Sequence, residues 1–213
     1  MEKENSTVPD DMNAGVATQR SPFVGHEHTG RPNAAGAIGV RLAAETLVSV
    51  TQVSTWISGV AGLEQALVEV LGQRAPALTG GTLRTPQGLV IRTGPEEFLI
   101  VAEGPADNTV WLRRHVGADV GSVTDLSHAR CRIRIAGNQC RDALGKLFPI
   151  DMRDAAFPVE QARLTGHHHV PCLIHRLGVD RFDLYVFSTY AHDQLSTLID
   201  AALEYGVALE DQR

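Results

Sequence analysis

Arginine occupies alternate positions of one segment, at Arg130, Arg132 and Arg134. The residues between and after them are Cys131, Ile133 and Ile135. Strict alternation is typical of a β-strand with one apolar and one polar face, and it places successive guanidinium groups about 6.8 Å apart. Cations in such a row repel one another unless water or acidic groups face them.

Two explanations of the arginine row are open. Either the row faces solvent or acids on a neighbouring strand of this chain, or it binds an acidic partner or a phosphate or carboxylate ligand. The second explanation makes Arg130, Arg132 and Arg134 candidate partner-contact residues. It fails if Arg132 and Arg134 each prove to be paired with acids of this same chain.

Histidine is the second residue type that could do chemistry here. Residues 167–169 are all histidine, and His175 follows six residues after the run. Consecutive strand residues point to opposite faces, so only the outer two of the run could share a metal ion, and His175 would lie about 20 Å along an unbroken strand. Glycine and proline bracket the run, which favours a polar loop or strand edge over a metal site. His26 and His28 lack a third ligand, so we expect them to be solvated.

Asp125, Ser127 and His128 have the residue types of a catalytic triad. Three members within four residues of one extended segment cannot converge as nucleophile, base and orienting group. We therefore expect Asp125 and Ser127 to satisfy turn backbone instead. The chain also has no P-loop, no dinucleotide-binding glycine motif, no nucleophile elbow and no paired carboxylates at metal spacing. We predict no catalytic, cofactor-binding or metal-binding residues in this chain.

The elements around the arginine row follow from local signals. A strand over 130–135 leads into a turn at 137–138, where Asn138 is placed to cap a helix. Apolar residues at helical spacing continue that helix to Pro149, which ends it. The other expected helices cover about 60–71, from Asp107 or Asn108 to Gly117, and about 190–205. The other expected strand segments are 40–53, 89–93, 96–102, 161–164, 170–176 and 182–187.

The two halves of the chain resemble each other. A shift of 84 residues superposes the segment 89–101 on 173–185, matching Leu, Arg, Gly and Phe, and a helix follows each segment. We predict an α+β fold in which two related strand–helix–hairpin–helix units, about 38–117 and 118–206, form one domain over 37–213. Residues 1–36 carry scattered glycine and proline without apolar periodicity and are expected to form a flexible arm. Pro22 and Phe23 are apolar enough to attach this arm to a surface, either its own or a partner's.

The composition argues against several classes of protein. The 213 residues carry a net charge of −6, which argues against general binding to nucleic acid. Three cysteines are too few for a disulfide framework, and Cys131 and Cys140 fall on apolar faces, so we expect buried, reduced thiols. No apolar run is long enough to span a membrane, and the N-terminus has no secretory signal, so we expect a cytoplasmic protein.

Several segments together resemble one family. Residues 123–137 (VTDLSHARCRIRIAG), followed by Ala143-Leu144 and by Pro149-Ile150-Asp151, look like the gamma subunit of heterotetrameric sarcosine oxidase. Residues 93–99 (TGPEEFL) and 182–186 (FDLYV) are similar to two further segments of that family. The resemblance runs from about Gly39 to Gly206 in the family's order.

This resemblance implies a fold similar to the aminomethyltransferase (glycine-cleavage T-protein) type. It also implies a flavoprotein complex of sarcosine catabolism and one-carbon metabolism, which oxidatively demethylates sarcosine to glycine and transfers the one-carbon unit to tetrahydrofolate. FAD, FMN, NAD and tetrahydrofolate would belong to the alpha and beta subunits and zinc to the delta subunit. This chain would be the structural gamma subunit, an oxidoreductase component without an active site of its own.

Other functions stay open. Similar subunits serve N-methylglutamate dehydrogenase and other amine oxidoreductases, and the substrate is chosen in a different subunit. A free-standing folate-binding protein of the same fold is a further alternative, although the related iron–sulfur-cluster proteins carry a Lys-Gly-Cys-aromatic-x-Gly-Gln-Glu segment that is missing here, where Arg-Asp-Ala follows Cys140. A small metal-binding protein built on the histidines is the third.

Overall fold

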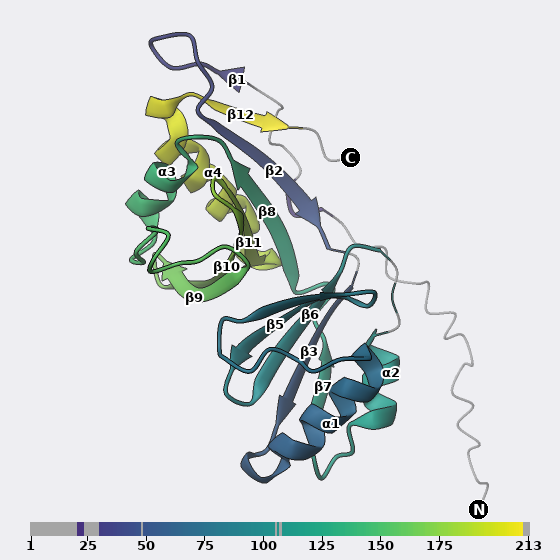
Figure 1. The fold of residues 1–213 in the computed structure, drawn as a ribbon. Coiled ribbons are helices and arrows are strands. Elements are labelled where there is room, and N and C mark those ends of the chain that lie inside the picture. Colours follow the sequence, from purple (N-terminus) through teal and green to yellow (C-terminus); the bar gives the residue numbers. More distant parts are fainter. Residues whose placement is uncertain (1–20, 24–29, 48, 105, 107, 211–213) are drawn as a thin grey trace, which may run out of the picture.

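The computed structural model of the protein describes residues 21–23, 30–47, 49–104, 106 and 108–210. Two antiparallel-rich sheets form the body, and each carries a pair of helices (Figure 1). The strands are β1 (Gly30–Arg31), β2 (Val40–Thr46), β3 (Ser49–Thr55), β4 (Thr82–Thr85), β5 (Gly88–Gly94), β6 (Glu97–Ala102), β7 (Gly121–Asp125), β8 (Arg130–Ala136), β9 (Gln161–His167), β10 (Val170–Gly178), β11 (Arg181–Phe187) and β12 (Val207–Glu210). The helices are α1 (Val60–Leu71), α2 (Asn108–His115), α3 (Cys140–Leu147) and α4 (Ala191–Ala202).

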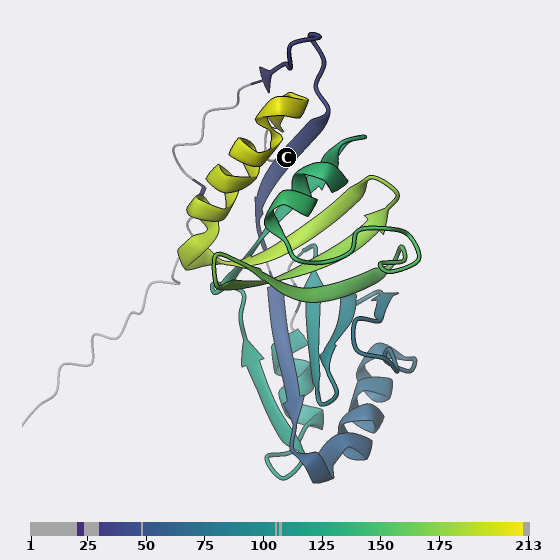
Figure 2. The ribbon, with the colours of Figure 1, turned by 90° about the vertical axis from the view of Figure 1, so that its left-hand side faces the viewer.

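The larger sheet has seven strands in the order β1-β12-β2-β8-β11-β10-β9. Its outer face is covered by α3 and α4, which lie side by side against it (Figure 2). Alternation places Cys131, Ile133 and Ile135 of β8 in the core under these helices, where all three are fully buried. The period-2 prediction for this strand is therefore confirmed.

The smaller sheet has five strands in the order β4-β5-β6-β3-β7 and carries α1 and α2 on its outer face. The apolar stripe of α1 includes Leu63, Leu67 and Val70, which are buried against this sheet. Gly72 ends the helix in the left-handed region, at φ +71°, and donates its N–H to the Val68 carbonyl. The predicted helix over 60–71 with a glycine after it is confirmed.

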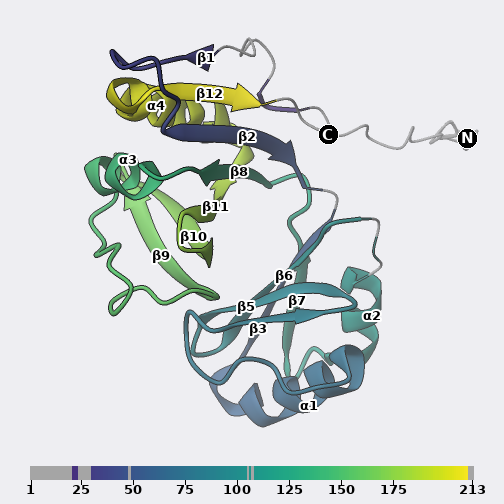
Figure 3. The same ribbon diagram turned by 45° about the horizontal axis from the view of Figure 1, so that its top comes forward.

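The inner faces of the two sheets meet at a third apolar cluster. Leu89, Ile91 and Leu99 come from the five-stranded sheet, and Leu173 and Tyr185 come from the seven-stranded sheet. The molecule is thus layered as helices, sheet, sheet, helices (Figure 3). None of the helices in the described ranges is both long and apolar enough to cross a membrane.

The two hairpins aligned by the 84-residue shift share an unusual detail. In β5–β6 the pairing register shifts between Arg92 and Gly94, and in β10–β11 it shifts between Arg176 and Gly178. In each hairpin the buried arginine donates its Nε–H to the carbonyl of that glycine, at 3.3 Å and 3.0 Å. Each guanidinium also lies over the phenylalanine matched by the same shift, at 5.0 Å and 5.7 Å. This shared geometry supports the idea of an internal repeat.

Strand pairing suggests different limits for that repeat. The order β3-α1-β4-β5-β6-α2-β7 is repeated as β8-α3-β9-β10-β11-α4-β12. The limits expected from the sequence put β2 in the first half and β7 in the second, whereas β2 pairs with β8 and β12, and β7 pairs with β3. We therefore propose units of 49–125 and 130–210, with β2 inserted between the last and first strands of the second unit.

Three local expectations need correction. Asn138 does not cap α3, because the N-cap position is Gln139 and no side chain bonds to the helix there. The strand-like segment 40–53 is two strands, β2 and β3, which lie in different sheets. Gly30–Arg31 of the expected arm pairs with β12, so the folded body begins before residue 37. Residues 1–20 and 24–29, which include His26 and His28, lie outside the described residues.

Candidate functional site

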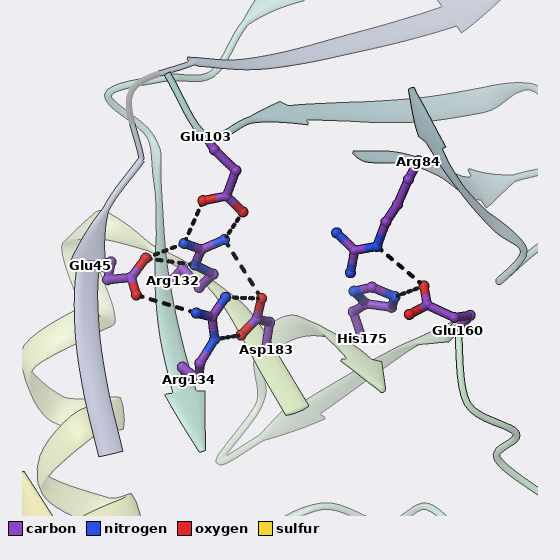
Figure 4. Close-up of polar contacts among 8 residues, drawn as sticks. All are labelled: Glu45, Arg84, Glu103, Arg132, Arg134, Glu160, His175 and Asp183. Atoms are coloured by element: carbon purple, nitrogen blue, oxygen red, sulfur yellow. Dashed lines mark hydrogen bonds and ion pairs between the residues drawn. The ribbon is translucent and has the colours of Figure 1, made fainter. Parts of the chain in front are cut away.

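A charged cluster lies on the inner face of the seven-stranded sheet, at the junction with the five-stranded sheet (Figure 4). The register between neighbouring strands brings the residues of this cluster together. Arg132 of β8 stands opposite Glu45 of β2, and Arg134 of β8 stands opposite Asp183 of β11. Glu103, which directly follows β6, reaches Arg132 from the other sheet. The cluster therefore joins the two units by ion pairs.

Arg132 is the centre of this cluster. Its side chain is only 5% exposed, yet it donates to Glu103 through Nη1 and Nη2 at 2.7 Å and 2.9 Å. Its Nε–H donates to Glu45 at 3.0 Å, and Asp183 lies 3.6 Å from Nη1. Burial alone would lower the pKa of Arg132, but these three carboxylates together raise it above its usual value. The charged form is thus held by acids of the same chain.

Arg134 makes a two-point contact with Asp183, with Nε and Nη2 donating at 2.8 Å and 3.0 Å. Asp183 is 1% exposed, so this carboxylate has no useful access to water. Both Arg132 and Arg134 are therefore paired with acids of this chain. That is the condition that excludes the interface interpretation for these two residues, and the internal-partner explanation is the correct one.

Arg130 differs from the other two arginines. It is half-buried, its guanidinium lies 3.6 Å from the centre of the Phe187 ring, and its Nε has no hydrogen-bond partner. Within the described ranges no acid lies within ion-pair distance of it. Burial lowers the pKa of Arg130 below its usual value. Its role as a partner contact stays a prediction.

The two apolar candidates of the arm lie against the chain itself. Phe23 is 5% exposed and belongs to the core under α3 and α4, whereas Pro22 is half-buried beside it. The arm is thus attached to its own surface at this point. A buried Phe23 cannot present its ring to another subunit, so of this pair only Pro22 is left as a partner-contact prediction.

A second polar group lies near the ionic cluster. His175 is fully buried, and its Nε2 lies 3.5 Å from a carboxylate oxygen of Glu160, which in turn lies 3.8 Å from Nε of Arg84. Neither ring nitrogen of His175 has a well-formed hydrogen bond to a described residue. Burial lowers the pKa of His175 below its usual value, because the charged ring would lose its hydration. A hollow of about 290 Å³ opens between this group and Arg134 with Asp183.

The histidine run forms a hairpin turn. His168 and His169 are the two residues between β9 and β10, with φ values of +48° and +66°. His167 is buried against Phe148, and its Nδ1 lies 3.4 Å from Nε2 of Gln194. In the part of the chain that the structure describes, no three His, Cys, Asp or Glu residues are grouped so that they could hold a metal ion. His168 and His169 thus form a turn and His167 ends the edge strand β9, which agrees with the expected polar loop or strand edge.

The candidate triad is also a turn. Ser127 donates both its N–H and its hydroxyl to one carboxylate oxygen of Asp125, at 2.9 Å and 2.6 Å. The Ser127 hydroxyl oxygen accepts the Val50 N–H at 3.0 Å. These hydrogen bonds lower the pKa of Asp125. Asp125 and Ser127 therefore satisfy backbone, as expected.

Five residues of the site were not singled out from the sequence: Glu45, Arg84, Glu103, Glu160 and Asp183. His175 was considered only as a possible metal ligand. Asp183 left a usable signal, because a lone acid between Phe182 and Leu184 in a buried strand requires a partner. Glu45 and Glu103 left none, since each meets Arg132 only through long-range pairing.

Comparison with known proteins places this geometry in a family. The family model described as the GCVT N-terminal domain matches residues 78–209, more than half of the chain. The chain belongs to the GCVT N-terminal domain family. It is 28% identical over 191 residues to a protein named sarcosine oxidase subunit gamma from Corynebacterium sp. (strain P-1), covering 89% of this chain and 93% of that one. A protein of the same name from Arthrobacter sp. is 29% identical over 192 residues, with the same coverage.

Solved structures agree with the family assignment. A chain of the heterotetrameric sarcosine oxidase from Corynebacterium sp. U-96, solved in complex with pyrrole 2-carboxylate, superposes with a TM-score of 0.71 at 26% identity, over 78% of this chain and 85% of that one. The glycine cleavage system aminomethyltransferase T from Bartonella henselae superposes with a TM-score of 0.56 at 15% identity, over 81% of this chain and 48% of that one. The predicted α+β fold of the T-protein type and the predicted resemblance to the gamma subunit are both confirmed.

Proposed function

We propose that this chain is the non-catalytic gamma-type subunit of a heterotetrameric sarcosine oxidase complex. That complex oxidises sarcosine to glycine and passes the one-carbon unit to tetrahydrofolate. The observation that carries the proposal is the match to proteins named sarcosine oxidase subunit gamma over about nine tenths of both chains. The TM-score of 0.71 to a chain of a heterotetrameric sarcosine oxidase supports the same role.

The chemistry of the described residues suits a structural subunit. Charged side chains that could act on a substrate, such as Arg132 and Asp183, are committed to each other and to their neighbours. Two hollows, of about 290 and 340 Å³, lie at the low end of the range for sites that enclose drug-sized ligands. On the resemblance to sarcosine oxidase gamma subunits we assign FAD, FMN, NAD and tetrahydrofolate to the alpha and beta partner subunits and zinc to the delta subunit.

Arg130 is our first candidate for a contact with one of these partners. It is a half-buried cation over the ring of Phe187, and no acid of the described residues lies within ion-pair distance of it. A carboxylate of a partner subunit would pair with it and offset its desolvation. Pro22 is a second, weaker candidate because it is only half-buried and lies near the folded body's surface.

The test is a gentle affinity purification of the tagged chain from its native cells, followed by a visible spectrum and a sarcosine turnover assay. A yellow preparation that oxidises sarcosine is expected. A colourless chain without partners would contradict the proposal. Arg130→Gln should reduce partner recovery, whereas Arg41→Gln, which removes an exposed arginine already paired with Glu210, should leave recovery unchanged.

A further inference from the structure

The arginines that line the hollow, or lie directly behind its lining, are of two kinds. Arg132 and Arg134 share three acids, Glu45, Glu103 and Asp183, through short hydrogen bonds. On this side of the hollow the acids outnumber the arginines and are already occupied. These groups satisfy one another and leave little binding capacity for a ligand.

The other wall has unused donors. Arg84 makes one loose ion pair, 3.8 Å from Glu160, and its terminal amino groups form no hydrogen bond to any described residue. Arg181 forms neither an ion pair nor a side-chain hydrogen bond with the described part of the chain. Both side chains line the hollow, Arg84 from β4 of one sheet and Arg181 from β11 of the other. On this wall two guanidinium groups therefore face one acid, Glu160, while Glu103 and Asp183 on the opposite side are already paired with Arg132 and Arg134.

A buried imidazole next to this wall has an ion-pair contact with Glu160 but no well-formed hydrogen bond to a described residue. His175 is fully buried beside Glu160, which lines the hollow, and both of its ring nitrogens are without a well-formed hydrogen bond. Figure 4 draws its ring between Arg84, Glu160 and Asp183. Native proteins rarely leave such a group unsatisfied, and a polar side chain of this kind is often completed by a bound molecule.

We propose that this hollow, at the junction of the two sheets, binds a small oxyanion, a carboxylate or a phosphate group, between Arg84 and Arg181. Guanidinium forks match the planar pair of oxygens in a carboxylate and two oxygens of a phosphate, and these are the strong charge-assisted hydrogen bonds of proteins. A volume of about 290 Å³ admits a phosphate ion or a small carboxylic acid. Because the two arginines come from different units, the ligand bridges them.

The test uses the full-length chain and NMR spectroscopy of its histidine rings. Inorganic phosphate and acetate are titrated separately, at constant ionic strength with sodium chloride. The His175 ring should shift in a saturable way with at least one of the two anions, whereas the ring of His115, exposed on α2, should not. Assignment of the His175 signal comes from its loss in His175→Gln. The anion with the lower Kd identifies the preferred chemistry.

Variants separate a built site from general charge attraction. Arg84→Gln and Arg181→Gln remove exposed side chains and should keep the fold, but each should raise the Kd about tenfold. Arg114→Gln removes one exposed positive charge from α2 and should leave the Kd within about twofold. The proposal is overturned if neither anion produces a saturable shift of His175, or if Arg114→Gln weakens binding as much as Arg84→Gln does.

Discussion

Removing Arg132 should destabilise the protein, because its guanidinium pairs with Glu45 of the seven-stranded sheet and with Glu103, which follows β6 of the five-stranded sheet. The substitution Arg132→Met keeps most of the side-chain volume and deletes the charge. It leaves Glu45, Glu103 and Asp183 without the guanidinium that all three contact. Asp183, with a side chain 2% exposed, then keeps Arg134 as its single ion-pair partner among the described residues.

The expected loss follows from burial. Deleting one partner of a buried ion pair costs about 3–5 kcal/mol, because the remaining charge stays desolvated. The side chains of Glu103 and Glu45 are 69% and 26% exposed, so these two acids can regain water and the loss should fall at the lower end. We expect about 3 kcal/mol, which for a domain of this size corresponds to a fall in Tm of about 6–12 °C.

The assay is urea unfolding followed by circular dichroism, with calorimetry for the Tm. The matched control is Arg41→Met, which removes an arginine of the same sheet whose pair with Glu210 is 3.3 Å long and about half exposed on both sides. Such a surface pair contributes at most about 1 kcal/mol. The reasoning is refuted if Arg132→Met costs less than about 1 kcal/mol, or no more than Arg41→Met.

Three further predictions test other parts of the structure. Burial lowers the pKa of His175 in the folded chain, whereas the same imidazole in the unfolded chain titrates near pH 6.5. Just below about pH 6.5 the unfolded chain therefore binds a proton that the folded chain does not. Stability should fall as the pH drops from about 6.5 towards the lower folded pKa. His175→Gln should make the free energy of unfolding depend less on pH, as measured by urea unfolding at pH 7.5, 6.5 and 5.5. Part of the pH dependence should persist because burial also lowers the pKa of His167. An unchanged pH dependence would contradict this prediction. Gly137→Ala should lower the stability by more than about 1 kcal/mol, because φ is +122° and a Cβ would meet the Gly39 carbonyl. Gly145→Ala in α3, where a Cβ meets nothing within 4 Å, should stabilise by about 0.5–1 kcal/mol. Thermal unfolding measures both variants, and a Tm that is higher for Gly137→Ala than for Gly145→Ala would contradict this prediction. Burial raises the pKa of the Cys131, Cys140 and Cys172 thiols to about 12, so iodoacetamide at pH 8 should alkylate the native chain far more slowly than the urea-unfolded chain, and rapid native labelling seen by mass spectrometry would count against it.

Elements with a strong local signal could be predicted from the sequence. Alternation in β8, the apolar stripe of α1 and the glycine after it are properties of a few neighbouring residues. The hairpins β5–β6 and β10–β11 were likewise expected, because their strands are apolar and bracketed by glycine. Physical rules that act within one helix or one hairpin were sufficient for these elements.

Sheet membership could not be predicted in the same way. β2 and β3 are adjacent in the chain, yet β2 pairs with β8 and β12 whereas β3 pairs with β6 and β7. Nothing local in the segment 40–53 distinguishes these partners. The division depends on which strands meet across the whole chain.

The ionic cluster escaped prediction for the same reason. The three arginines of β8 were evident, but the acids of Arg132 and Arg134 lie 29 to 87 residues away and meet them only through strand register and sheet packing. Asp183 carried the available signal, as a lone acid in a buried strand. With that signal, the pairing of Arg134 could have been expected once β8 and β11 were placed side by side.

The most direct test of the subunit role is the mass of the native assembly. The tagged chain is purified gently from its own cells and measured by native mass spectrometry, and collision dissociation then identifies the released subunits. The expected result is one stoichiometric heterotetramer in which this chain is present once with three different partners. A chain that is released alone, or only as copies of itself, would contradict the account.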